Sequence, residues 1–120
     1  MESKHTTRKM LWTVLAELLG TAFLTLAFNL GGQGNCAPVT LGLTCFMMMQ
    51  IFDPLGGAHF NPAVTLAMSL RWRKADIARH NKFKYVFLEI IAQIIGAILG
   101  CVSSMVIMQV AQPSSKQGDA

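Results

Sequence analysis

The chain has 120 residues, of which 52% are hydrophobic and 13% are charged. An average soluble domain carries about 25% charged residues, and a domain of this size needs many polar side chains to cover its surface. The composition therefore argues against a water-soluble enzyme and favours an integral membrane protein.

Ten basic and six acidic residues give the chain a formal net charge of +4. Such an excess would suit either nucleic acid or an anionic membrane surface. The basic residues gather before the first apolar segment and between residues 71 and 84, beside later apolar segments, which favours the membrane. The three cysteines are widely spaced and predict neither a disulfide framework nor a zinc site, so we expect no metal and no cofactor.

The first long apolar segment covers about residues 10–31 and contains a single charged residue, Glu17. About 20 apolar residues are enough to cross a hydrocarbon core about 30 Å thick. The apolar part of a cleaved signal peptide is shorter, about 7–15 residues. We therefore interpret this segment as a retained transmembrane helix.

Two further apolar segments follow, at about residues 38–52 and 85–111. We expect the former to end at Asp53-Pro54, because proline disfavours helical geometry in the residue before it. In the latter, Gly96 and Gly100 are expected to let a neighbouring helix of the same unit approach closely. The predicted organisation is a cytoplasmic tail at 1–9, a membrane unit at 10–111 and a polar tail at 112–120.

A short helix is predicted at about residues 62–70. Asn61 is a favourable N-cap, and Pro62 suits the first helical position, where its missing N–H costs nothing. Nine residues extend only about 13 Å, roughly half of the hydrocarbon core, so this helix cannot span. We expect it to occupy one half of the membrane, with protein or water around the irregular segment that leads to it.

Orientation follows from the positive-inside bias. Three spans place both groups of basic residues on one side of the membrane, which is then the cytoplasmic side, and place the C-terminus outside.

The start of the short helix could contact a passing solute. A helix N-terminus carries about +0.5 elementary charge, which repels cations, while the amide of Asn61 can donate a hydrogen bond. The small residues around Gly57, Ala58 and His59 allow backbone carbonyls to face a lumen as acceptors. Donors and acceptors in this arrangement suit a neutral, hydrogen-bonding solute.

Three motifs support this interpretation. Residues 56–65 read Gly-Gly-Ala-His-Phe-Asn-Pro-Ala-Val-Thr, residues 16–21 read Ala-Glu-Leu-Leu-Gly-Thr, and residues 93–97 read Gln-Ile-Ile-Gly-Ala. In spacing, order and topology they resemble the aquaporin and aquaglyceroporin (major intrinsic protein) family. The resemblance implies an all-α membrane fold whose repeat contains three transmembrane helices and a re-entrant half-helix carrying Asn-Pro-Ala. It also implies a passive channel for water and/or small neutral solutes, in a membrane that the sequence does not identify.

The resemblance assigns roles to individual positions. It makes Asn61 the hydrogen-bond donor at the pore centre and Glu17 a buried carboxylate that holds the loop, rather than a proton relay. Leu41 falls at a constriction that is often aromatic or histidine in the family, so an aliphatic residue there argues against strict selection for water. The remaining implied site residues are the carbonyl donors to the lumen, Gly57, Ala58 and His59, and the turn residues Pro62 and Ala63.

The chain carries only one repeat, whereas the family fold pairs two inverted repeats. The resemblance therefore implies the N-terminal half of a pore, which needs a second half-repeat or a full-length channel, and it implies assembly into tetramers. We interpret the chain as a fragment or truncated product. Two copies in opposite orientations are disfavoured because the basic residues lie on one side.

Two other functions remain as alternatives. One is a truncated, non-conducting membrane protein that associates with full-length channels. The other is a basic soluble protein that binds nucleic acid through Trp72, Phe83 and Tyr85 within the basic segment, although we prefer a cytoplasmic loop with interfacial aromatics. No nucleotide-binding loop or nucleophile–base pair is present, so no enzymatic activity is predicted.

Overall fold

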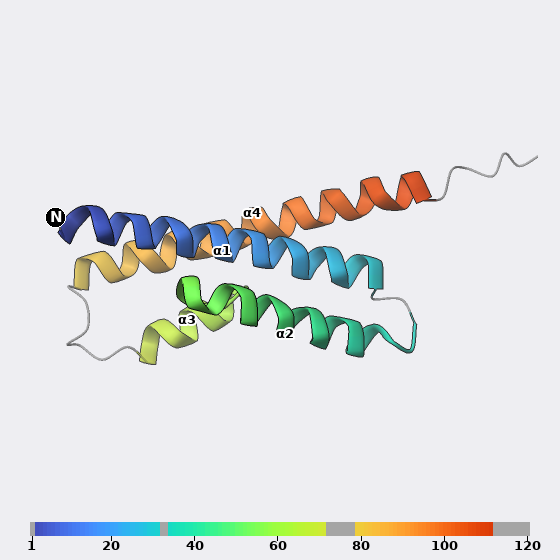
Figure 1. Cartoon of the computed structure of the whole chain (residues 1–120), viewed down its shortest axis with the longest axis horizontal. Helices are drawn as coiled ribbons and strands as arrows, with labels where there is room; N and C mark the ends of the chain where they lie inside the picture. Colours follow the sequence, from blue (N-terminus) through green and yellow to red (C-terminus); the bar gives the residue numbers. More distant parts are fainter. Residues whose placement is uncertain (1, 32–33, 72–78, 112–120) are drawn as a thin grey trace, which may run out of the picture.

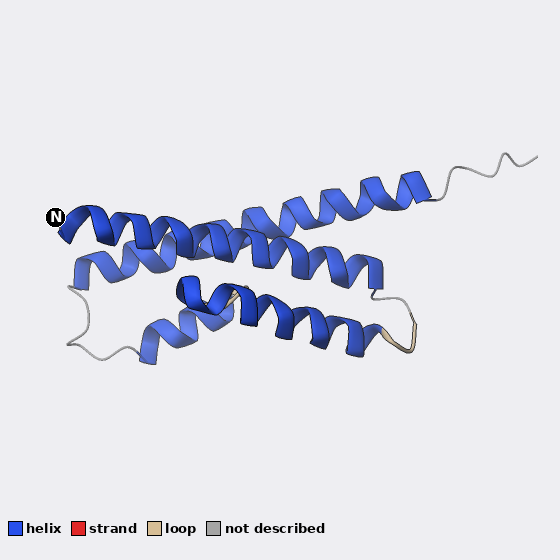
Figure 2. Ribbon diagram, in the orientation of Figure 1, coloured by secondary structure: helices blue, strands red, loops and turns tan. Residues whose placement is uncertain are grey.

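The structure is a computed structural model that describes residues 2–31, 34–71 and 79–111. These residues form four α-helices and, within those ranges, no strand (Figures 1 and 2). The helices are α1 (Glu2–Gly31), α2 (Ala37–Gly56), α3 (Pro62–Arg71) and α4 (Arg79–Ala111). Three segments are long and apolar enough to cross a membrane: Thr7–Gly31, Ala37–Gly56 and Phe83–Ala111. The prediction of three candidate spans is confirmed.

Helix α1 lies at the centre of the arrangement. It packs against α4 and, with a different part of its surface, against α2, while α3 packs against α4. In Figure 1, α3 begins near the middle of the long axis and runs back toward the end at which α1 and α4 begin. The start of α3 therefore lies near the middle of the molecule, in a helix that packs against α4.

Small residues bring α1 and α4 together. Ala16 on α1 and Ala92 on α4 are both 2% exposed. A Cβ atom added at Gly96 would collide with the carbonyl oxygen of Leu18, and one added at Gly100 would collide with the carbonyl oxygen of Ala22. These glycines therefore pack within the unit, where close backbone approach replaces the hydrophobic driving force that is missing in lipid.

Helix α2 has a different environment. None of its residues is buried, and its large apolar side chains, such as Val39, Leu43 and Phe46, are about three-fifths exposed at 62%, 59% and 59%. Outward-facing apolar side chains are expected of a helix in lipid or beside a further subunit.

The prediction that Asp53-Pro54 ends the second helix is wrong. Helix α2 continues through Pro54 to Gly56. Proline removes one backbone hydrogen bond, to the carbonyl four residues earlier, and its bias against a preceding helical residue is not absolute. Gly56 and Gly57, with φ of 134° and 125°, end the helix instead, because glycine adopts positive φ without steric cost.

Other helix boundaries also extend beyond the predicted ones. The first helix begins at Glu2 instead of about residue 10, α3 ends at Arg71, and α4 begins at Arg79 instead of about residue 85. Helices of membrane proteins continue into the water layer wherever local propensity allows, so hydropathy locates the span and not the helix ends. The predicted tail at 112–120 and the middle of the basic segment, at 72–78, lie outside the described residues.

We expect Gly96→Ala to lower the free energy of unfolding in detergent by about 1–3 kcal/mol, because the added methyl group meets rigid backbone and forces α1 and α4 apart. Gly42→Ala is the matched control, since a Cβ added at Gly42 has no heavy atom within 4 Å. Chemical unfolding followed by circular dichroism measures both. Equal stabilities for the two variants would show that the α1–α4 contact is not close packed.

Candidate functional site

The segment between α2 and α3 has an unusual backbone. Ala58 and Phe60 have φ of 45° and 51°, and they follow the two glycines that end α2. Residues other than glycine rarely adopt positive φ, and each such residue costs about 1–3 kcal/mol unless its surroundings hold it. Both residues are nevertheless buried, at 3% and 4% exposed. The surrounding structure therefore fixes this loop.

Glu17 supplies the main restraint. The side chain is 1% exposed, and its Oε1 accepts the backbone N–H of His59 at 2.7 Å. Its Oε2 accepts the backbone N–H of Phe60 at 2.7 Å and the side-chain amide of Gln93 at 2.7 Å. Short hydrogen bonds to an ionised acceptor are roughly twice as strong as neutral ones. One carboxylate on α1 thus binds both the loop and α4.

The ring of Phe60 completes the restraint. It occupies the space above Gly20 on α1, where an added Cβ would collide with it, and it meets the ring of Phe52 edge to face with centroids 6.0 Å apart. Edge-to-face contact is a favoured arrangement of aromatic rings. The loop is thereby anchored on its apolar side as well.

The hydrogen-bond network continues to α3. The amide of Gln93 also donates to the hydroxyl oxygen of Thr65 at 2.8 Å, and Nδ1 of His59 lies 3.2 Å from the same oxygen. Gln93 and Thr65 are each 1% exposed. The network therefore joins α1, the loop, α3 and α4 in the interior.

Asn61 lies at the start of α3. Its Oδ1 accepts the backbone N–H of Ala63 at 2.8 Å, as an N-cap side chain does, and Pro62 is the first residue of the helix. Asn61 is exposed, and among the described residues its Nδ2 group has no hydrogen-bond partner. The cap therefore fixes the side chain and leaves its donor group available.

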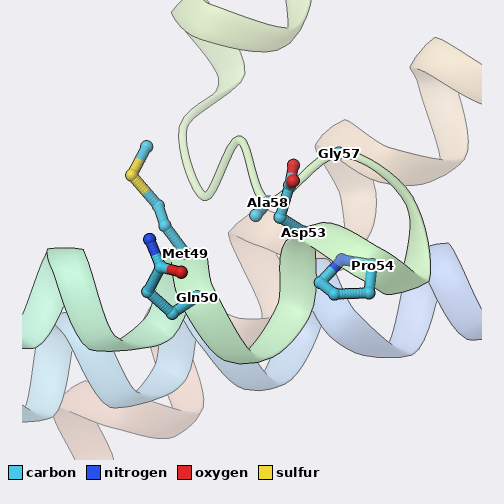
Figure 3. Close-up of a pocket in the computed structure, with 6 residues that line it drawn as sticks. All are labelled: Met49, Gln50, Asp53, Pro54, Gly57 and Ala58. Atoms are coloured by element: carbon cyan, nitrogen blue, oxygen red, sulfur yellow. The ribbon is translucent and has the colours of Figure 1, made fainter.

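A pocket of about 300 Å³ lies between α2 and the loop (Figure 3). Its walls come from one face of α2 and from the first loop residues, and in Figure 3 the side chain of Asp53 points toward the loop. The lining residues are Met49, Gln50, Asp53, Pro54, Gly57 and Ala58. Gly57 and Ala58 thus face a space that water can enter.

Leu41 lies elsewhere, in an apolar cleft of about 260 Å³ between α1 and α2. Phe60 lines the same cleft, whereas Gly57 and Ala58 line the polar pocket. The structure therefore brings Glu17, His59, Asn61 and its neighbours into one region and places Leu41 beside it.

Comparison with protein families identifies the family of the chain. Residues 4–119 match the family described as "Major intrinsic protein". The chain belongs to the major intrinsic protein family. This is a family of membrane channels and not of enzymes, and with three candidate spans the chain is an integral multi-pass membrane protein.

Individual family members are similar to this chain over part of their length. Aquaporin-4 of Mus musculus is 40% identical over 77% of this chain and 32% of its own length. The glycerol uptake facilitator protein-like 6 of Lactiplantibacillus plantarum is 41% identical over 71% of this chain and 38% of its own length. Aquaglyceroporin AqpS of Rhizobium meliloti is 35% identical over 72% of this chain and 39% of its own length. The chain thus spans about a third of the length of the curated relatives it matches. No solved structure matches it.

Sequence reasoning missed three members of this network. Thr65 and Gln93 are assigned no role beyond their place in the motifs at 56–65 and 93–97, and Glu89 is assigned none. Glu89 is 6% exposed, and its Oε2 lies 3.6 Å from Nδ1 of His59. A charged residue within an apolar segment was the available signal, because such residues in membrane proteins are costly and mark functional-site candidates.

His59 lies between the candidate spans. Its side-chain contact with Glu89 raises its pKa above the ordinary value of 6.5, burial opposes the rise, and the charges of Glu17 and Glu89 add to it.

We expect Glu17→Gln to release the loop. An amide keeps one acceptor oxygen and turns an NH₂ group toward a buried backbone N–H, so at least one N–H of His59 or Phe60 loses its partner, at a cost of about 1–3 kcal/mol. Hydrogen–deuterium exchange at these two amides should accelerate. Asp53→Asn makes the same chemical change at an exposed carboxylate and should leave their exchange unaltered. Unchanged exchange in Glu17→Gln would show that the carboxylate does not hold the loop.

Proposed function

We propose that this chain forms one half of a passive transmembrane channel for water and/or small neutral solutes. In this proposal α3 is a re-entrant half-helix that carries Asn61 at the pore centre. The observation that supports it most is the loop of positive-φ residues that Glu17 holds against α1, directly before the capped start of α3.

The proposed mechanism uses fixed donors and acceptors. The free Nδ2 group of Asn61 would donate to a solute oxygen, and the carbonyls of Gly57, Ala58 and His59 would accept from its hydrogens. The positive end of α3 would repel hydronium and other cations. A neutral molecule that both donates and accepts would pass, because it exchanges hydrogen bonds with water for hydrogen bonds with the wall.

The other wall of the pore is proposed to come from a second half-repeat of inverted topology. In support, none of the residues of α2 is buried, and Val64 and Leu66 on α3 are 41% and 51% exposed. The chain also spans only about a third of its relatives' length. We place the N-terminus in the cytoplasm, on the basis of the basic residues, and propose assembly into tetramers by analogy with the family.

A chimera tests the proposal. The aligned segment of mouse aquaporin-4 is replaced by that of this chain, the product is reconstituted into liposomes, and swelling is followed by light scattering. We expect the chimera to swell faster than empty liposomes and this chain alone to match them. Asn61→Leu in the chimera should reduce the rate severalfold, because the solute loses the hydrogen-bond donor that Asn61 supplies.

Gln109→Leu is the control for the loss of an amide, since Gln109 lies on the exposed final part of α4. The reconstituted proteins are compared at equal amounts after size-exclusion chromatography. A chimera that assembles and does not conduct, or an Asn61→Leu variant that conducts normally, contradicts the proposal.

The uncovered surface of α2 also favours a second candidate, a non-conducting protein that associates with full-length channels. When the chain is co-expressed with a tagged full-length relative, affinity purification should then recover both chains. Liposomes that contain both chains should swell more slowly than liposomes that contain the full-length relative alone. Recovery of the relative alone, with unchanged swelling, would contradict this second function.

A further inference from the structure

Glu89 is a second buried carboxylate in the interior, and its partners differ from those of Glu17. It lies on α4 within the candidate span Phe83–Ala111 and is 6% exposed. Among the described residues its Oε2 has no hydrogen-bond partner, whereas Glu17 accepts three hydrogen bonds. A carboxylate oxygen removed from water requires a donor. A neighbouring side chain can supply that donor.

Gln93, one helical turn further along α4, cannot be the donor. An amide nitrogen carries two hydrogens, and those of Gln93 are already given to Glu17 and Thr65. Among the described residues, His59 is a polar neighbour of Glu89, with its Nδ1 3.6 Å from Oε2 and the two side chains 12% and 8% exposed. This separation lies just outside hydrogen-bond range, so a small rotation of the ring would close it.

The position of the imidazole hydrogen decides whether Glu89 is satisfied. Nδ1 of His59 is also 3.2 Å from the hydroxyl oxygen of Thr65. With a bare Nδ1, Thr65 would donate to the ring and Glu89 would face a lone pair. With a hydrogen on Nδ1, the N–H is directed at both Thr65 and Glu89. Only the second state gives the buried carboxylate a donor.

The carboxylate of Glu89 faces Nδ1 of His59, and a bond dipole with its hydrogen toward a carboxylate is favoured where the local dielectric constant is low. The other acidic groups on this side are Glu17 from α1, which accepts the backbone N–H of His59, and Asp53 from α2, which lines the pocket beside Gly57 and Ala58.

We infer that Glu89 is a positioning residue that holds a hydrogen on Nδ1 of His59 and thereby sets the direction of the hydrogen bond between His59 and Thr65, with His59 as the donor. In this state Thr65 accepts from both His59 and Gln93. Any effect of this hydrogen bond on the pore rests on the proposed function, but the site of the hydrogen does not.

The experiment is nitrogen-15 NMR of the full chain in lipid bilayers, labelled at histidine. The chain has three histidines, so a background of His5→Gln and His80→Gln leaves the ring of His59 as the sole signal. At neutral pH we expect the Nδ1 resonance in the protonated range. Glu89→Leu should lose this signal and shift the ring to the tautomer with hydrogen on Nε2. Glu89→Gln should retain it, because an amide oxygen still accepts from Nδ1.

If Nδ1 of His59 carries no hydrogen in the protein with native Glu89, the inference is overturned. This outcome does not depend on whether a Glu89 variant folds. A Glu89→Leu spectrum identical to that of the parent also overturns it. Because no transport is measured, these outcomes stay distinct from those of the swelling assays. If the chimera does not conduct while Nδ1 of His59 is protonated in the chain, the channel proposal is contradicted and the assignment of the hydrogen to Nδ1 stands.

Discussion

The hydrogen bonds from the backbone of His59 and Phe60 to the carboxylate of Glu17 are the interaction on which the rest of the site depends. Backbone that is neither helix nor sheet persists at membrane depth only where protein or lumen water satisfies its polar groups. Glu17 supplies that partner from a helix already fixed by its neighbours. The carboxylate thus permits the chain to turn back between α2 and α3 without leaving donors unpaired.

The polar network and the apolar packing occupy one seam between α1 and α4. On α4, Gln93 follows the buried Ala92 and precedes by three residues Gly96, which meets the backbone of α1 at close range. Close backbone approach brings the amide of Gln93 within 2.7 Å of Glu17. Larger residues at the glycines would separate the helices and lengthen this hydrogen bond. Packing by small residues is therefore a condition for the polar contacts and not an independent feature.

Local sequence signals were sufficient for much of the fold. Hydropathy located three candidate spans, and Asn61-Pro62 located the start of α3 within one residue. The end of α2 was missed because glycines with positive φ, and not Pro54, decide it. The neighbours of Glu89 could not be predicted, because they depend on how α4 is rotated against the loop. A charged residue within an apolar segment is expected to have a polar partner, but only the tertiary structure identifies that partner.

The energies explain how the strained loop is held in place. Positive φ at Ala58 and Phe60 costs about 1–3 kcal/mol each, and the two residues are adjacent to His59 on either side. Each hydrogen bond to a charged acceptor contributes about 1.5–3 kcal/mol, and Glu17 makes two to this loop and one to Gln93. The two hydrogen bonds to the loop contribute an energy of the same order as the cost of the two positive φ values, and the packing of Phe60 over Gly20 adds to the stabilisation. A loop so held keeps its carbonyl directions fixed, which a passage selective by hydrogen bonding would require.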